Sequence, residues 1–353
     1  MGSARSKGLM ERDVRYCTTA DGVRIAYTVT GTGPPLVWVA DILASHVQRE
    51  WDLPVLREYY SGAASWRTLV RFDSRGLGLS DREIEDLSLD PRVRDLEAVA
   101  DRLGLGEFAL LGDDPISGWV VVTYAVRHPE RVSHLILQDC CVSASDFTSA
   151  PSALTLTEML VRDWEMFTEN IGSLQFGWAD PQARQFGEYI RTCVTEQTVK
   201  RSYVALATVD VSSLLPLIRA PTLVLGHTAV RTQPVDMTRD IAALIPDARV
   251  RVIEGGWGDN IQDALDAIEE FLGGGEQRVS ATKQPTIGLT PRETEVLSLL
   301  AGGYSAKEIA AHLAVSLSTV QRHIANIYAK IGVRGRVEAA AYAIERGLVR
   351  PRG

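Results

Sequence analysis

Over about the first 270 residues, short apolar runs rich in β-branched residues alternate with longer amphipathic stretches. Because these runs are nearly continuous and are separated by helical spacings, they predict parallel strands buried on both faces of a sheet. Two further segments flank an Asp21-Gly22 turn and predict a leading antiparallel hairpin, Arg15–Thr19 with Val23–Thr28. The expected parallel strands are Pro35–Asp41, Arg67–Ser74, Phe108–Asp114, Ser133–Cys140, Pro221–His227 and Arg249–Gly256.

The alternation of strands and helices is interrupted once and then ends. Between Val142 and Ala220 helical stretches replace the strands, which predicts a helical cap over about residues 142–219 inserted into the sheet domain. Residues 274–288 carry glycines, polar residues and a proline without any apolar period, as a flexible linker does. We therefore expect an α/β body at residues 1–273, a linker at 274–288 and a small domain at 289–353.

Charge is distributed unevenly between these parts. From Leu289 onward the chain has nine Lys/Arg and five Asp/Glu, a net charge of +4. The rest has 28 basic and 40 acidic residues, a net charge of −12. A small basic module on a large acidic body indicates that the module contacts a polyanion and the body does not.

Composition excludes several other classes of protein. Apolar residues make up 45% of the 353 residues and charged residues 23%, which is ordinary for a folded globular chain. The four cysteines lack the spacing of a disulfide framework or a zinc site. We therefore expect no bound metal and a reducing compartment. The chain starts without the apolar segment of a signal peptide and has no apolar run of about 18 residues. These features predict a cytoplasmic protein without a membrane partner.

Three local motifs of the body carry a family resemblance. RFDSRGLGLSD at Arg71–Asp81 looks like a fourth-strand turn, VRHPERVSHLIL at Val126–Leu137 like the helix-to-strand return after a nucleophile, and APTLVL at Ala220–Leu225 like a seventh strand. With these motifs, roughly Val14–Leu272 resembles the α/β-hydrolase family. The resemblance implies an α/β-hydrolase-like sheet with a helical cap inserted after the sixth strand, although a fold does not by itself define a function.

The nucleophile of that family sits in a G-x-S-x-G elbow, and here the corresponding segment is Gly112–Trp119, GDDPISGW, with no serine at the nucleophile position. Asp114 has two interpretations: a nucleophile, as in dehalogenase-like relatives, or the N-cap of a helix with Pro115 in its first turn. The elbow needs a positive φ, whereas a residue before proline is driven to extended conformations, which favours the cap. Ser117 is interpreted as a first-turn helix residue rather than as a displaced nucleophile.

The other catalytic positions implied by the resemblance are also altered. The expected acid after the seventh strand falls on Val230, and the expected histidine after the eighth strand falls on Gly258. The oxyanion loop, usually His-Gly, reads Ala40-Asp41-Ile42, and a carboxylate there would repel a developing oxyanion. We therefore predict that the protein is not an enzyme.

The space between sheet and cap in this fold forms an apolar pocket with a few polar groups at the strand ends. We predict that it binds a small, largely apolar organic ligand and that no cofactor is required. The adjacent Cys140 and Cys141 are interpreted as buried thiols, with a redox or soft-metal sensor as the alternative. The candidate ligand-binding residues are Asp41, Ile42, Asp114, Pro115, Cys141, Trp164, His227 and Trp257.

The C-terminal module has the signals of four short helices. The first helix is capped by Thr290 with Glu293 and ended by Gly302-Gly303, and the second, Ala306–Leu313, is capped by Ser305 with Glu308. The third runs from Ser316 or Ser318 to Ile331, and the fourth is Arg336–Arg346. The third helix has one apolar face formed by Val320, Ile324, Ile327 and Ile331 and an opposite face formed by Gln321, Arg322, Ala325 and Ala329. Small residues beside long donors are typical of a helix that approaches base edges, so the short turn before it completes a helix-turn-helix.

The ordered motifs LTxRExEVLxLLAxG, KEIAxxL, STVxxH, KIGVxxR and EAxxxA run through this module. They resemble the LuxR/GerE-type DNA-binding domain over its whole length. The resemblance implies that Gln321, Arg322 and Ala325 face bases. The residues that it implies at phosphates are Ser305, Lys307, Ser318, Thr319, His323 and Lys330.

A ligand-binding body joined to a DNA-binding tail indicates a one-component transcriptional regulator. Because one short module makes few phosphate contacts, we expect a homodimer on an inverted-repeat operator in duplex DNA. Two alternatives stay open: a regulator that hydrolyses its effector through Asp114 and His227, and a body that serves only for dimerisation or protein interaction.

Overall fold

The computed structural model describes two compact units, residues 1–276 and residues 277–353. The first unit contains the α/β body and the second contains the C-terminal helices. The described residues are 13–149, 151–176, 181–230, 232–273, 291–301 and 304–313, with Val320, His323, Ile324, Ile327, Tyr328, Lys330, Val333 and Ala339.

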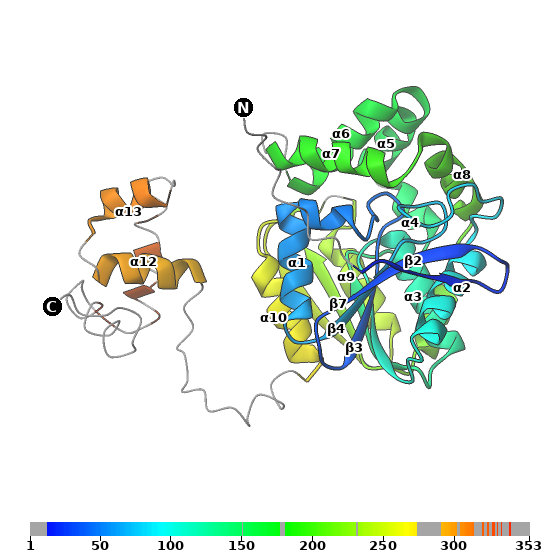
Figure 1. Ribbon diagram of the computed structural model, residues 1–353, viewed down its shortest axis with the longest axis horizontal. Helices are drawn as coiled ribbons and strands as arrows, with labels where there is room; N and C mark the ends of the chain where they lie inside the picture. The colour runs from blue at the N-terminus through cyan, green and yellow to red at the C-terminus, as the bar shows by residue number, and fades with distance from the viewer. Residues whose placement is uncertain are drawn as a thin grey trace, which may run out of the picture. The chain divides into compact units, whose positions relative to one another are not determined.

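A mixed sheet forms the centre of the first unit, and within the described residues it has eight strands (Figure 1). Their order is β1-β2-β4-β3-β5-β6-β7-β8, with β1–β2 and β2–β4 antiparallel and the other neighbours parallel. The predicted hairpin and the six predicted parallel strands are confirmed, with their ends shifted by a few residues. The strands are β1 (Arg15–Thr18), β2 (Arg24–Thr30), β3 (Pro35–Val39), β4 (Thr68–Phe72), β5 (Phe108–Gly112), β6 (Val132–Gln138), β7 (Thr222–His227) and β8 (Ala248–Ile253).

The central strands are apolar because both of their faces are covered. Every residue of β5 and β7 is buried, and β3 and β4 are buried after their first residue. Helices α1 (Pro54–Ala64) and α10 (Ile261–Phe271) pack on one face, while α2 (Leu89–Arg102) and α3 (Pro115–Arg127) pack on the other (Figure 1). Helix α9 (Val235–Leu244) packs against β7 and β8. This is the two-sided burial that continuous apolar strands predict.

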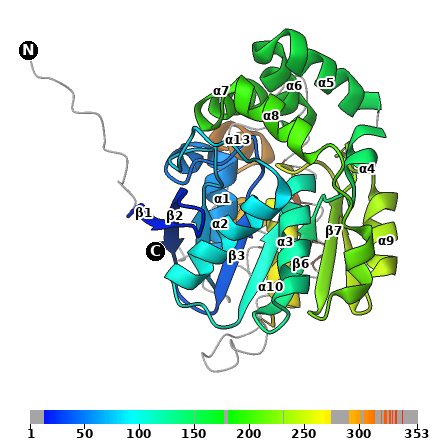
Figure 2. The ribbon, with the colours of Figure 1, turned by 90° about the vertical axis from the view of Figure 1, so that its right-hand side faces the viewer.

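The helical cap lies between β6 and β7 in the sequence and over one end of the sheet in space (Figure 2). Its α6 and α7 lie unusually close, since a Cβ on Gly172 would fall 2.0 Å from the carbonyl oxygen of Ala183. The predicted helical insertion is confirmed. The cap elements are α4 (Ala144–Ser149), α5 (Pro151–Arg162), α6 (Trp164–Phe176), α7 (Pro181–Cys193), α8 (Glu196–Leu206) and the 3-10 helix η2 (Ser212–Leu217).

The second unit has its own small core. Helices α12 (Pro291–Ala301) and α13 (Ala306–His312) confirm the first two predicted helices, and Ser305 caps α13 in the predicted capping box with Glu308. The predicted third and fourth helices fall mostly outside the described residues. Of the predicted apolar face, Val320 and Ile327 are fully buried and Ile324 packs against them, together with Val296, Leu297, Leu300, Ile309, Ala310 and Ala339.

Candidate functional site

Asp114, which the sequence resemblance places near the nucleophile position, caps a helix. Asp114 has φ −161° and ψ 176°, so its backbone is extended rather than left-handed. Its Oδ1 accepts a hydrogen bond from the Ser117 backbone N–H at 2.8 Å, and the Ser117 side chain closes a capping box. The interpretation of Asp114 as the N-cap of α3 is confirmed, with Pro115 in the first turn.

Ser117 is not placed as a displaced nucleophile either. Its Oγ accepts hydrogen bonds from the backbone N–H groups of Asp113 and Asp114 at 2.9 and 3.1 Å. The side chain is buried, and its hydroxyl points back to the Asp114 carbonyl oxygen. The hydroxyl therefore serves the start of α3, and this role fits the interpretation made from the sequence.

A buried acid–histidine pair joins the ends of β6 and β7. His227 is fully buried, and its Nδ1 lies 2.6 Å from Asp139 Oδ2 while its backbone N–H donates to Asp139 Oδ1 at 2.8 Å. Among the described non-glycine residues only Asp139 has a positive φ, of 47°. His227 Nε2 has no hydrogen-bond partner in the described part of the chain. Within the described residues, therefore, no hydroxyl group is hydrogen-bonded to the second ring nitrogen of this histidine.

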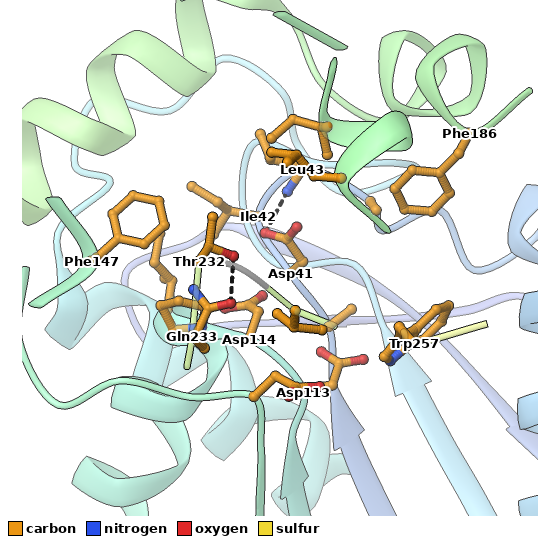
Figure 3. Close-up of a pocket in the computed structure, with 18 of the residues that line it drawn as sticks. Asp41, Ile42, Leu43, Asp113, Asp114, Phe147, Phe186, Thr232, Gln233 and Trp257 are labelled. Atoms are coloured by element: carbon orange, nitrogen blue, oxygen red, sulfur yellow. Dashed lines mark hydrogen bonds between the residues drawn. The ribbon is translucent and has the colours of Figure 1, made fainter. Parts of the chain in front are cut away.

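A cavity of about 120 Å³ lies between the sheet ends and the cap (Figure 3). Its lining is mainly apolar and aromatic, interrupted by carboxyl groups. Trp257 belongs to this wall and is held by stacking on Tyr59, with ring centroids 4.9 Å apart. The principal lining residues are Asp41, Ile42, Leu56, Tyr60, Asp113, Asp114, Pro115, Asp139, Phe147, Leu156, Ile171, Leu174, Phe186, Tyr203, Val230, Gln233 and Trp257.

Burial makes three carboxyl groups of the cavity, those of Asp41, Asp113 and Asp114, weaker acids than usual. It raises the pKa of Asp113 to about 7, and the neighbouring Asp114 charge adds to this effect. It also raises the pKa of Asp41 to about 6 and that of Asp114 well above the ordinary value. Asp41 and Asp114 hydrogen-bond to one another through their side chains, so this pair shares a proton.

The structure brings five of the eight predicted ligand-binding residues to this cavity: Asp41, Ile42, Asp114, Pro115 and Trp257. It does not bring the other three there. The Cys141 thiol turns to the Ser143 carbonyl oxygen, and Trp164 stacks on Phe167 inside the cap. His227 is directed to Asp139 and does not line the cavity.

Several residues of the cavity were not predicted from the sequence. Asp113 directly follows β5 and Asp139 directly follows β6, so both lie at the same edge of the sheet. Their position after a predicted strand was a signal in the sequence. Tyr60, Phe147 and Tyr203 come from helices whose inward faces the sequence pattern did not resolve.

The predicted DNA-contact residues lie in the second unit. Ser305 is the N-cap of α13 and Lys307 is exposed beside it. His323 is half-buried, and Lys330 Nζ donates to Glu293 Oε2 of α12 at 2.8 Å. The remaining predicted contacts fall outside the described residues: Ser318, Thr319, Gln321, Arg322 and Ala325.

The first unit has the α/β-hydrolase fold. A hydrolase from Pseudomonas aeruginosa PA01 superposes with a TM-score of 0.61 and 21% identity, covering 74% of this chain and 98% of that one. The esterase RhEst1 from Rhodococcus sp. ECU1013 superposes with a TM-score of 0.63 and 20% identity, again covering 74% and 98%. At this identity the likeness establishes the fold alone.

The second unit carries a LuxR-family domain, since residues 288–343 match the family described as "Bacterial regulatory proteins, luxR family". The oxygen regulatory protein NreC of Staphylococcus aureus (strain bovine RF122 / ET3-1) is 38% identical over 82 residues. That match covers 23% of this chain and 38% of NreC, so the chain spans well under half of this relative. Among the described residues, no helix is long and apolar enough to cross a membrane.

Proposed function

We propose that this protein is a one-component transcriptional regulator. In this proposal the first unit binds a small, largely apolar organic ligand in the cavity, and the second unit binds duplex DNA. The observation that carries the proposal is the combination of a LuxR-family domain at residues 288–343 with a body whose nucleophile position has become a helix cap over a lined cavity.

The body is proposed to bind its ligand without turnover. The Asp114 carboxyl group is engaged in the cap of α3, and Val230 stands where the family has its acid. Asp41 lines the cavity on the side of the oxyanion loop, where a negative charge opposes the chemistry that the family performs. The Asp139–His227 pair favours the alternative of residual hydrolysis, yet among the described residues no hydrogen bond joins His227 to Asp114.

DNA binding is proposed to involve two copies of the chain. By resemblance, Gln321 and Arg322 would contact base edges in the major groove, while Lys307 and other polar residues would contact phosphates. A single module with few cationic residues gives modest affinity at cellular salt, and a homodimer on an inverted repeat doubles the contacts. Ligand control requires that the ligand bind two arrangements of the protein unequally, typically by about 1–3 kcal/mol.

A cavity-filling substitution tests the proposal in cells. A duplex selected by the full-length protein from a random pool would drive a reporter, and compounds would be screened for a response. Ile171→Trp fills the cavity from α6 and should abolish the response, while the control Met166→Trp, on the exposed side of the same helix, should retain it. A response that persists in Ile171→Trp would overturn the assignment of the cavity as the sensor.

A hydrolysis assay separates the regulator from the enzyme alternative. Purified protein should release no 4-nitrophenol from 4-nitrophenyl acetate above a denatured control. Turnover that is present in the wild type and lost in both Asp114→Asn and His227→Ala would favour the hydrolase instead.

A further inference from the structure

The cavity has carboxyl groups and no basic side chain in its described lining. Asp41, Asp113, Asp114 and Asp139 all contribute to the wall, whereas no Lys, Arg or His belongs to it among the described residues. Asp113 Oδ1 is buried and receives no hydrogen bond from a donor in the described part of the chain. Buried carboxylate oxygens without donors are costly, and a ligand that donates hydrogen bonds would relieve this cost.

Two buried arginines lie behind the wall without lining the cavity. Arg71 of β4 lowers the pKa of Asp113, but its guanidinium is bound to Glu50 at 2.9 Å, with both side chains buried. Arg92 of α2 interacts electrostatically with Asp95 and then more weakly with Asp114 and Asp41. It donates to the Leu87 carbonyl oxygen and to Ser202 Oγ, while its Nη1 has no hydrogen-bond partner in the described part of the chain. Neither side chain lines the cavity.

The remaining neighbours leave a net negative charge. Asp139 of β6 is paired with His227 of β7, while Tyr60 of α1 and Tyr203 of α8 stay neutral because burial raises the pKa of each hydroxyl. Burial and the nearby carboxylates likewise keep the Cys140 thiol neutral. Arg71 and Glu50 cancel, and Arg92 offsets the single charge of the proton-sharing Asp41–Asp114 pair. Ionised Asp113 is then left without a counter-charge, a deficit that one monovalent cation would fill.

The rest of the lining suits an organic cation rather than a metal ion. Figure 3 shows the carboxyl groups of Asp41, Asp113 and Asp114 near the middle of the cavity wall, with Phe147 and Trp257 around them. Aromatic faces attract an ammonium group, and apolar walls accept the body that carries it. Within the described residues no group of His, Cys, Asp or Glu has the arrangement of a metal site.

We infer that the cavity binds a small organic amine in its protonated form, with the ammonium group at Asp113 and the Asp41–Asp114 pair and the apolar body against the cap. This inference rests on the proposed ligand-controlled function and names the class of its ligand. The cavity volume of about 120 Å³ is of the same order as the roughly 150 Å³ of a cavity that admits benzene, so the amine carries at most one ring. A ligand of this kind displaces protons from the carboxyl groups as it binds.

Three isosteric probes test the inference on the full-length protein. Benzylamine, benzyl alcohol and benzoate share a ring and a one-carbon polar substituent but are cationic, neutral and anionic. At pH 8 benzylamine should bind with a Kd of about 1 mM or tighter, a value that eight non-hydrogen atoms can supply. Its Kd should be about tenfold lower than that of benzyl alcohol, in line with one charge-assisted hydrogen bond in a buried site, and benzoate should not bind.

The pH dependence separates a cation from a ligand that accepts hydrogen bonds from protonated carboxyl groups. The affinity for benzylamine should rise about tenfold from pH 6 to pH 8, because Asp113 ionises in this interval and the amine stays protonated. A neutral acceptor would bind more weakly over the same interval. Asp113→Asn should reduce the preference for amine over alcohol to about twofold or less, while the control Asp52→Asn, an exposed carboxylate outside the cavity, should leave it unchanged.

Asp41→Asn provides a second variant should Asp113→Asn fail to fold, as judged by circular dichroism. The inference of an amine ligand would be overturned if benzylamine did not bind. It would also be overturned if benzyl alcohol or benzoate bound more tightly than benzylamine and Ile171→Trp abolished that binding. Either result would leave the proposed sensor role intact. The sensor role itself fails separately, when the reporter response persists in Ile171→Trp. Benzylamine binding that persists in Ile171→Trp would place the amine outside the cavity and overturn the inference.

Discussion

Asp113→Asn is expected to stabilise the first unit at pH 8 and to have a smaller or opposite effect at pH 5. Asp113 Oδ2 accepts a hydrogen bond from Trp38 Nε1 at 2.7 Å, and the carbonyl oxygen of asparagine preserves this contact. The substitution therefore removes the charge and little of the geometry. The new amide N–H groups add a cost that does not depend on pH, and this cost cancels when the two pH values are compared.

The magnitude follows from the pKa of the buried carboxyl group. An aspartate in the unfolded chain has a pKa of about 3.9, whereas burial and the neighbouring Asp114 raise the pKa of Asp113 to about 7. Folding then takes up a proton between these pH values, so the free energy of unfolding falls as the pH rises from about 4 to about 7. Three units at about 1.36 kcal/mol set a ceiling of about 4 kcal/mol, and screening by water in the cavity reduces the expected effect to about 2 kcal/mol.

Urea unfolding monitored by tryptophan fluorescence measures this difference. All seven tryptophans precede residue 277, so the signal reports the first unit even in the full-length chain. The variant-minus-wild-type difference in the free energy of unfolding should rise by about 2 kcal/mol from pH 5 to pH 8. A difference that stays constant with pH, as expected for the exposed control Asp52→Asn, would refute the buried state of Asp113.

Three further predictions concern packing, chemistry and DNA. Gly118→Ala should lower the free energy of unfolding by about 1–3 kcal/mol, because the added Cβ meets Cys140 Sγ at 2.7 Å. Adding Cys140→Ala should restore the stability, whereas additive losses of the two substitutions in urea unfolding would contradict this contact. Ester turnover should stay at background in stopped assays from pH 5 to pH 9, and activity lost in Asp114→Asn would contradict inactivity. Arg322→Ala should cost about 1–3 kcal/mol on the selected duplex and little on random duplex in fluorescence anisotropy, whereas Lys307→Ala should weaken both and flatten the salt dependence. Equal losses on both duplexes for Arg322→Ala would exclude a base contact.

The sheet was predictable because its strands carry the pattern of their environment. A strand covered on both faces must be apolar throughout, so β5 and β7 are evident from composition alone. The cap of α3 was predictable because Asp114 stands before Pro115, and two local rules agree there. The ends of the strands were less certain, since hydrogen-bonded pairing stops before the apolar sequence does.

The cavity was only partly predictable, because its wall depends on side-chain direction and on tertiary contacts. Trp257 and Asp41 follow strands at the expected edge, and the fold directs both to the cavity. His227 follows the same rule but turns to Asp139, whose left-handed backbone no sequence pattern indicated. Trp164 lies on a cap helix, and the periodicity of that helix does not distinguish packing within the cap from contact with the cavity.

Control of DNA binding by the ligand is tested most simply by the affinity of the full-length protein for its selected duplex, with and without a ligand bound in the cavity. Fluorescence anisotropy would measure this Kd with saturating benzylamine, or with whichever of the three probes binds the wild type but not Ile171→Trp. The ligand should change the Kd about 5- to 150-fold in the wild type and in Met166→Trp, and not in Ile171→Trp. An unchanged Kd in the wild type, under conditions where the probe occupies the cavity, would contradict control of DNA binding by the body.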